Sequence, residues 1–167
     1  TPVLMGGYGG FQVPRLPSYL GSIGKIWLER GGAYILGNMR GGGEFGPGWH
    51  QSAIRENKQR TWDDFLAIAE DAVARGITSP DHLGIQGGSQ GGLLVGTAFT
   101  QRPDLFNAAI VQIPLFDMLR YHVIGRGAFG EVRRARYRGV RDVAVKTGLS
   151  LARASDAGRI SSWGSTA

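Results

Sequence analysis

The chain has 167 residues, 42% of them hydrophobic, and a net charge of +6. This composition is typical of one globular domain, and no apolar run approaches the ~20 residues that a membrane helix needs. The absence of cysteine excludes disulfides, thiolate catalysis and cysteine-based metal sites.

Short apolar runs alternate with helical patterns along residues 1–122. The patterns predict strands at 2–5, 33–36, 83–85 and 108–111, and helices at 19–30, 61–75 and 93–101. Gly31 is expected to end the first helix, and Asp63 and Asp64 to lie in the first turn of the second, where the helix dipole favours acids. This alternation predicts an α/β fold, with a mostly parallel sheet and helices on both faces.

The sequence GGSQG at 87–91 fits the pattern G-x-S-x-G. In that pattern the serine sits on a tight turn between a strand and a helix, and side chains two residues to either side would clash. An apolar strand precedes this pattern and an apolar helix follows it, so Ser89 is the predicted nucleophile. The alternative is a chance glycine-rich turn, since the chain contains 28 glycines.

Acyl transfer also needs hydrogen-bond donors for the developing oxyanion. The backbone N–H of Gln90, the residue after the nucleophile, is one such donor. A second must come from a loop after an earlier strand, and Tyr8 in the glycine-rich loop GGYGGF at 6–11 is placed for it. From spacing alone, Tyr8 fits equally well as an aromatic side chain packed in that loop.

Residues 1–122 resemble the catalytic domain of the prolyl oligopeptidase family, an α/β-hydrolase fold. The resemblance is carried by MGGYGGF at 5–11, NMRGGGEFG at 38–46, WH at 49–50, GGSQGGLLV at 87–95, QRPDLF at 101–106 and DMLRYH at 117–122. It implies that Ser89 is the nucleophile and that Tyr8 donates to the oxyanion. The family usually has Asn where this chain has Gln90, which affects the site little because the expected donor is the backbone.

The resemblance also implies parts that these 167 residues lack. The family places its catalytic Asp and His well downstream of the nucleophile, carries an N-terminal propeller, and has a substrate-stacking Trp just beyond the position of His122. The chain begins at Thr1 without Met and enters a strand at once, so we expect a truncated α/β-hydrolase domain. The expected compartment is the cytoplasm, with the periplasm left open because the N-terminus is expected to be missing.

The three histidines are weak candidates for the missing base. His50 follows a glycine turn and is predicted to be a structural hydrogen-bonding residue. His82 lies in a surface turn at the entry end of the Ser89 strand. His122 ends the family resemblance and is not the family's base.

Residues 123–167 carry the whole charge excess, since residues 1–122 are neutral. Within 123–147, GRGAFGEV at 125–132 and VAVK at 143–146 resemble the glycine loop and lysine of a protein kinase, which would make Lys146 a phosphate ligand. No kinase catalytic loop follows, so the segment is interpreted as a fused kinase remnant or a frame-shifted hydrolase segment. Residues 148–167 are predicted to be a disordered tail.

These observations predict a serine peptidase that hydrolyses peptide bonds through an acyl-enzyme on Ser89, impaired because the catalytic Asp and His lie outside the chain. The alternatives are a nucleotide-binding kinase-like fragment and a non-catalytic hydrolase remnant. The expected partner is a peptide substrate, with no cofactor, metal, nucleic acid or membrane. Residues 108–111 are expected to form an unpaired sheet edge through which the chain self-associates.

Overall fold

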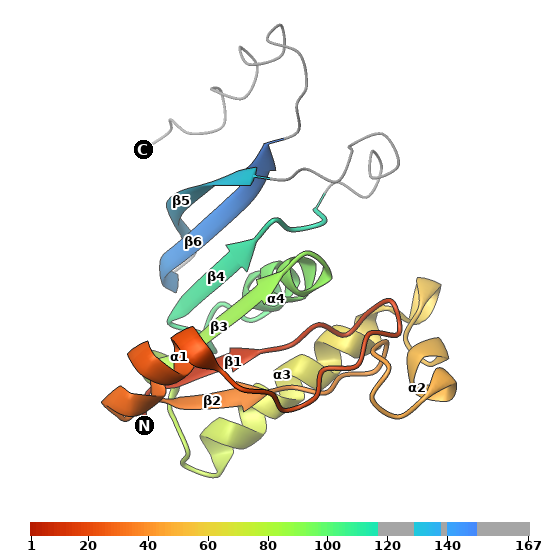
Figure 1. The fold of residues 1–167 in the computed structure, drawn as a ribbon, viewed down its shortest axis with the longest axis horizontal. Coiled ribbons are helices and arrows are strands. Elements are labelled where there is room, and N and C mark those ends of the chain that lie inside the picture. Colours follow the sequence, from red (N-terminus) through yellow and green to blue (C-terminus); the bar gives the residue numbers. More distant parts are fainter. Residues whose placement is uncertain (117–128, 138–139, 150–167) are drawn as a thin grey trace, which may run out of the picture.

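The computed structural model describes residues 1–116, 129–137 and 140–149. Its strands form one twisted sheet in the order β2-β1-β3-β4-β6-β5 (Figure 1). The strands are β1 (Val3–Gly6), β2 (Ala33–Leu36), β3 (Leu83–Gly88), β4 (Ala108–Gln112), β5 (Phe129–Tyr137) and β6 (Val140–Leu149). The pairs from β2 to β6 are parallel, and only the outermost pair, β5 with β6, is antiparallel.

Helices connect the parallel strands and cover both faces of the sheet. They are α1 (Gly21–Ile26), α2 (Pro47–Gln51), α3 (Gln59–Ala74) and α4 (Gln90–Gln101), with 3-10 turns η1 (Leu28–Arg30), η2 (Arg55–Asn57) and η3 (Pro80–His82). From β1 the chain moves to β2 on one side, and from β2 it returns past β1 to β3 and β4 on the other side. Because such crossovers are right-handed, α1 lies on one face of the sheet and α3 and α4 lie on the other. Figure 1 shows α1 in front of the sheet and α4 behind it, which confirms the predicted fold class.

The core lies between the sheet and the helices α3 and α4. Val3 and Met5 of β1 and Leu83 and Ile85 of β3 are fully buried, because alternate side chains of each strand point to the same face. The apolar side of α3 packs on this face, with Phe65 fully buried.

Two predictions about the helices are wrong. The segment 19–30 is not one helix, since α1 ends at Ile26 and a separate turn, η1, follows it. Gly31 does end this turn, at a left-handed φ of 84°. Helix α3 begins at Gln59, two residues earlier than expected, so Asp63 and Asp64 lie beyond its first turn. Asp63 accepts a hydrogen bond from the Gln59 side chain, and Asp64 accepts hydrogen bonds from Arg40.

The prediction that 108–111 form an unpaired sheet edge is also wrong. Strand β6 pairs with the whole of β4, from Ala108 opposite Asp142 to Gln112 opposite Lys146. The arginine-rich composition of the tail does not prevent this, because the ladder is made by backbone groups that every residue except proline supplies. One face of β4 stays open, since Ile110 is 38% exposed.

Other predictions for the tail are not tested. The strands β5 and β6 cover parts of the segment 123–147, but the start of its glycine run lies outside the described residues. The predicted disordered tail at 148–167 also lies outside them, apart from Gly148 and Leu149. The resemblance of residues 123–147 to a kinase therefore remains a prediction.

Candidate active site

Ser89 occupies a strained turn between β3 and α4. Its backbone has φ 57° and ψ −118°, in the left-handed half of conformational space that a residue with a Cβ rarely adopts. Neighbouring backbone bonds hold it there: the Ser89 N–H donates to the Gln112 carbonyl at 2.9 Å, and the Gly92 N–H donates to the Ser89 carbonyl at 3.0 Å. This geometry turns the serine side chain away from the strand, as a nucleophile elbow requires.

The glycines around Ser89 are required by close backbone approaches. A Cβ at Gly87 would collide with the carbonyl group of Gly91, across the turn from it. A Cβ at Gly91 would lie 2.6 Å from the carbonyl oxygen of Gly7. The two glycines of the G-x-S-x-G pattern therefore allow the turn to close and the loop after β1 to pack directly on it.

The turn lies where the winding of the sheet reverses. Strands β1 and β3 are neighbours, and the chain leaves their carboxyl ends in opposite directions. In open α/β sheets this switch point forms the crevice in which ligands bind. The loop that begins at Gly7 and the turn that holds Ser89 both lie there, so the topology alone brings two distant glycine-rich segments together.

All three predicted site residues lie near this switch point. Tyr8 and Ser89 are half-buried, and the Tyr8 ring carbon Cδ2 is 3.7 Å from the Cβ position of Gly91. Gln90 begins α4, and its side chain is only 4% exposed. Its Cγ would be 2.5 Å from a Cβ at Gly10, so the side chain fills the space beneath the Tyr8 loop. Its Nε2 has no hydrogen-bond partner in the described structure.

The glycine-rich segment 38–46, which follows β2, is hydrogen-bonded to α3. Asp64 accepts hydrogen bonds from the Arg40 backbone N–H at 2.9 Å and from Arg40 Nε at 2.8 Å. This hydrogen bonding raises the pKa of the Arg40 guanidinium above its usual value. The buried hydroxyl of Thr61 donates to the Arg40 carbonyl at 2.7 Å. Segment and helix therefore form one scaffold beside the Tyr8 loop.

Sequence reasoning missed Lys58, which joins this scaffold to the Tyr8 loop. Its Nζ donates to the Gly9 carbonyl oxygen at 2.5 Å and to Thr61 Oγ1 at 3.1 Å. Burial lowers the pKa of Lys58 to about 8. The sequence carries no signal for this contact, because a single lysine before a helix is most often a solvated surface residue.

The two described histidines, His50 and His82, each lie within hydrogen-bond distance of an oxygen atom away from Ser89. His50 Nδ1 lies 2.6 Å from the Gly41 carbonyl oxygen, which confirms the prediction of a hydrogen-bonding role. His82 lies in η3, at the entry end of β3, with its Nδ1 2.9 Å from Ser79 Oγ. His122 lies outside the described residues. No side chain of the described part hydrogen-bonds the Ser89 hydroxyl.

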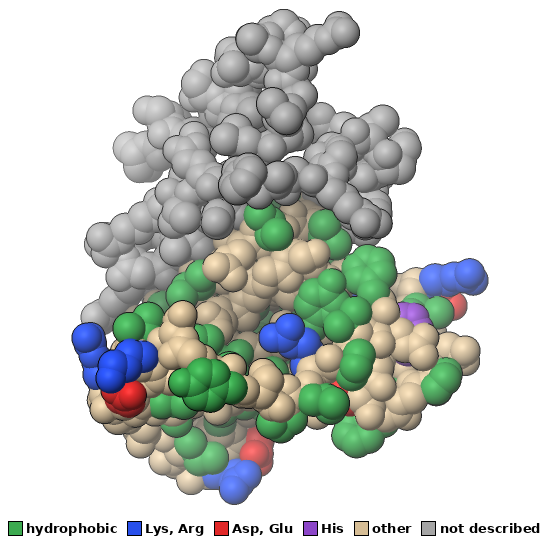
Figure 2. Space-filling view, in the orientation of Figure 1, with side chains coloured by type: hydrophobic (Ala, Val, Ile, Leu, Met, Phe, Trp, Pro, Cys, Tyr) green, Lys and Arg blue, Asp and Glu red, His purple; other side chains and the backbone are tan. Residues whose placement is uncertain are grey.

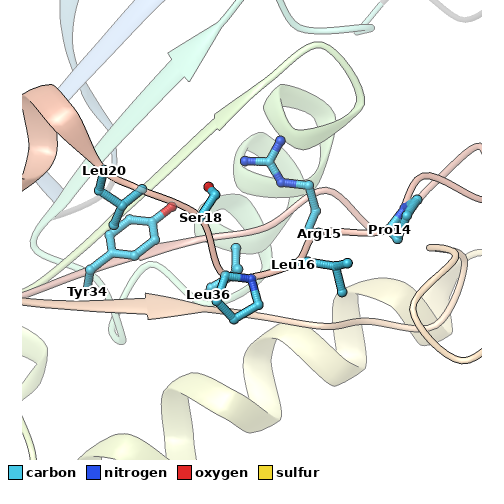
Figure 3. A pocket seen from close by; sticks show the side chains of 8 residues that line it. Pro14, Arg15, Leu16, Ser18, Leu20, Tyr34 and Leu36 are labelled. Carbon is cyan, nitrogen blue, oxygen red and sulfur yellow. The ribbon is translucent and has the colours of Figure 1, made fainter.

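A cavity of about 410 Å³ lies apart from this site (Figure 3). It is bounded by the loop residues 14–18 and by Leu20, Tyr34 and Leu36, and none of Ser89, Tyr8 and Gln90 lines it. Apolar side chains are exposed over the face of the molecule in Figure 2, and Phe11 and Tyr19 of the same loop are 58% and 96% exposed.

Two further features are absent from the residues that the structure describes. No helix among them is long and apolar enough to cross a membrane. They also contain no group of three or more His, Cys, Asp or Glu side chains that could hold a metal ion.

The strand order, the crossovers and the strained serine define the catalytic core of an α/β-hydrolase. Residues 20–141 match the model of the prolyl oligopeptidase family, and the chain belongs to that family. This agrees with the resemblance found in residues 1–122.

Curated relatives and solved structures support the assignment. An uncharacterized peptidase, y4nA, of Sinorhizobium fredii is 54% identical over 128 residues, or 77% of this chain and 18% of the relative. A prolyl endopeptidase of Elizabethkingia miricola is 40% identical over 77% of this chain and 18% of the relative. The structure of a post-proline cleaving enzyme from Rickettsia typhi superposes with a TM-score of 0.72 at 48% identity, covering 74% of this chain and 18% of that one. The chain thus spans about a fifth of the length of these relatives.

Proposed function

We propose that this chain supplies the nucleophile and the oxyanion donors of a serine peptidase. Ser89 Oγ attacks the carbonyl carbon of a peptide bond, and the resulting oxyanion accepts hydrogen bonds from the Gln90 backbone N–H and the Tyr8 hydroxyl. A general base takes the proton of Ser89 Oγ and passes it to the leaving amine as the peptide bond breaks, which leaves an acyl-enzyme on Ser89. Water then attacks the acyl-enzyme, releases the acid and restores the Ser89 hydroxyl. The proposed compartment is the cytoplasm.

The observation that carries this proposal is the backbone of Ser89, strained at φ 57° and ψ −118° at the switch point of the sheet. Strain of this kind costs of order 1–3 kcal/mol and is concentrated at functional sites. The Tyr8 loop packs on the same turn, which supports placing the nucleophile and the two donors in one site.

The proposed substrates are peptides, with cleavage after proline. The names of the relatives, prolyl endopeptidase and post-proline cleaving enzyme, support this choice. Because no described side chain hydrogen-bonds the Ser89 hydroxyl, we expect turnover by the 167-residue chain to be low. Serine proteases without part of their catalytic triad retain roughly 10³–10⁴-fold catalysis over water, which sets the expected upper limit.

Labelling with a fluorophosphonate tests the proposal without requiring turnover. The reagent should modify the unaltered chain slowly, and Ser89→Ala should abolish the modification. Ser18→Ala, in the exposed loop beside the cavity, is the matched control and should label like the unaltered chain. Modification that persists in Ser89→Ala would show that Ser89 is not the nucleophile.

A further inference from the structure

Lys58 makes a long-range contact to the backbone of the Tyr8 loop. It lies immediately before α3, and its Nζ is 2.5 Å from the carbonyl oxygen of Gly9, which is 49 positions away in the sequence. Its second bond, to Thr61 Oγ1 at 3.1 Å, orients the ammonium group from the first turn of the helix.

Gly9 is the residue directly after Tyr8, so this contact acts on the peptide group next to the proposed oxyanion donor. Gly9 has a left-handed φ of 62°, and the methyl group Cγ2 of Thr61 packs against it. The loop lies beyond the end of β1 and has no strand ladder to hold it. The contact from Lys58 fixes this loop at Gly9, and the Gln12 N–H, which donates to the Gly41 carbonyl at 3.3 Å, fixes it three residues further on.

The surroundings of Lys58 are unfavourable for its charge. Lys58 makes no ion pair within the described residues, and its two partners are a neutral carbonyl and a neutral hydroxyl. Burial without a counter-ion disfavours the ammonium form, which is why its pKa falls to about 8. A group kept in such surroundings is better explained by what it positions.

We propose that Lys58 is a positioning residue, which holds the Tyr8 loop against the Ser89 turn so that the Tyr8 hydroxyl is aligned for the oxyanion. Donors aligned in advance contribute most to catalysis, because they need no rearrangement as charge develops. This inference rests on the proposed function of Ser89, Tyr8 and Gln90.

A double-mutant cycle on fluorophosphonate labelling tests it. Lys58→Met keeps the length of the side chain and removes its donors, and Tyr8→Phe removes the hydroxyl. Each single variant should lower the maximal labelling rate by roughly tenfold or more, with the reagent's affinity unchanged, since an oxyanion donor acts on the transition state. The double variant should label no more than about twofold slower than Tyr8→Phe, because Lys58 acts through Tyr8.

Lys25→Met is the matched control, since Lys25 pairs with Glu29 on the exposed surface and should not affect the rate. If Lys58→Met does not melt cooperatively, Lys58→Gln replaces it, because that side chain stays polar but is too short to reach Gly9. Losses that multiply in the double variant, or an unchanged rate in Lys58→Met, would overturn the inference while Ser89→Ala still abolishes labelling. Labelling that persists in Ser89→Ala would instead overturn the proposed function, and this inference with it.

Discussion

Gly7 and Gly91 meet at the switch point of the sheet, with the Gly7 carbonyl oxygen 2.6 Å from the place where a Cβ of Gly91 would stand. This contact joins the loop after β1 to the first turn of α4. It sets how closely Tyr8 approaches Ser89, although Gly7 and Gly91 are 84 positions apart in the chain.

Gly91→Ala should therefore damage both stability and the site. The added methyl group must push the Gly7 carbonyl away, and overpacking of this kind costs about 1–3 kcal/mol. Urea denaturation should show the loss of stability, and fluorophosphonate labelling should slow. The matched control is Gly24→Ala in α1, where no atom lies within 4 Å of the new methyl group and the change should be neutral or stabilising by up to about 1 kcal/mol. Equal behaviour of the two variants would contradict the prediction.

Asp64→Asn should destabilise the scaffold beside the Tyr8 loop. The change removes the charge that the Arg40 guanidinium and backbone N–H both bind, and hydrogen bonds to charged groups contribute about 1.5–3 kcal/mol. The control is Asp71→Asn in the same helix, whose exposed pair with Arg75 should contribute at most about 0.5 kcal/mol. Denaturant midpoints measure the stability of both variants. A larger loss of stability in Asp71→Asn would refute the role of Asp64 in the scaffold.

The stability of the chain should depend on pH through Lys58. Its pKa is about 8 in the folded chain and near the usual 10.5 when unfolded, so the unfolded state binds more protons between these values. Stability rises with pH wherever that is true. The penalty for the charged amine is therefore fully present below pH 8 and fades as the pH rises toward 10.

Melting temperatures of the unaltered chain and of Lys58→Met, taken at pH 7, 8, 9 and 10, check this dependence. The unaltered chain should gain stability relative to the variant across this series, because other titrating groups cancel in the difference. A difference that is constant with pH, or that moves the other way, would show that the pKa of Lys58 is not lowered.

Disrupting β6 should expose the edge of β4 and promote self-association. Ala144 lies inside β6, opposite Ile110 of β4, and proline there removes a backbone donor from the middle of the sheet. Ala144→Pro should form dimers or larger species in size-exclusion chromatography, since an unpaired apolar strand templates pairing. Ala144→Ser retains the amide group and should elute like the unaltered chain. Coincident elution of all three proteins would argue against protection of β4 by β6.

Local patterns in the sequence were enough to predict the first four strands and the turn that holds Ser89. Apolar runs located β1 to β4 to within a few residues, because buried strands need continuous apolar side chains. The G-x-S-x-G pattern marked Ser89, since only glycine tolerates the close approaches found at Gly87 and Gly91. The strands and the turn depend on residues that are adjacent in the chain, and these can be read directly from the sequence.

Tertiary structure alone decided which distant groups meet. The sequence placed Asp63 and Asp64 at a helix end, but the folded chain brings Asp64 to Arg40. Composition made the arginine-rich tail look unable to pair with β4, although backbone ladders are indifferent to most side chains. The bond from Lys58 to Gly9 has no sequence signature, because it joins a side chain to a carbonyl that every residue possesses. Only the winding of the sheet, which brings the start of α3 beside the loop after β1, determines which carbonyl that lysine reaches.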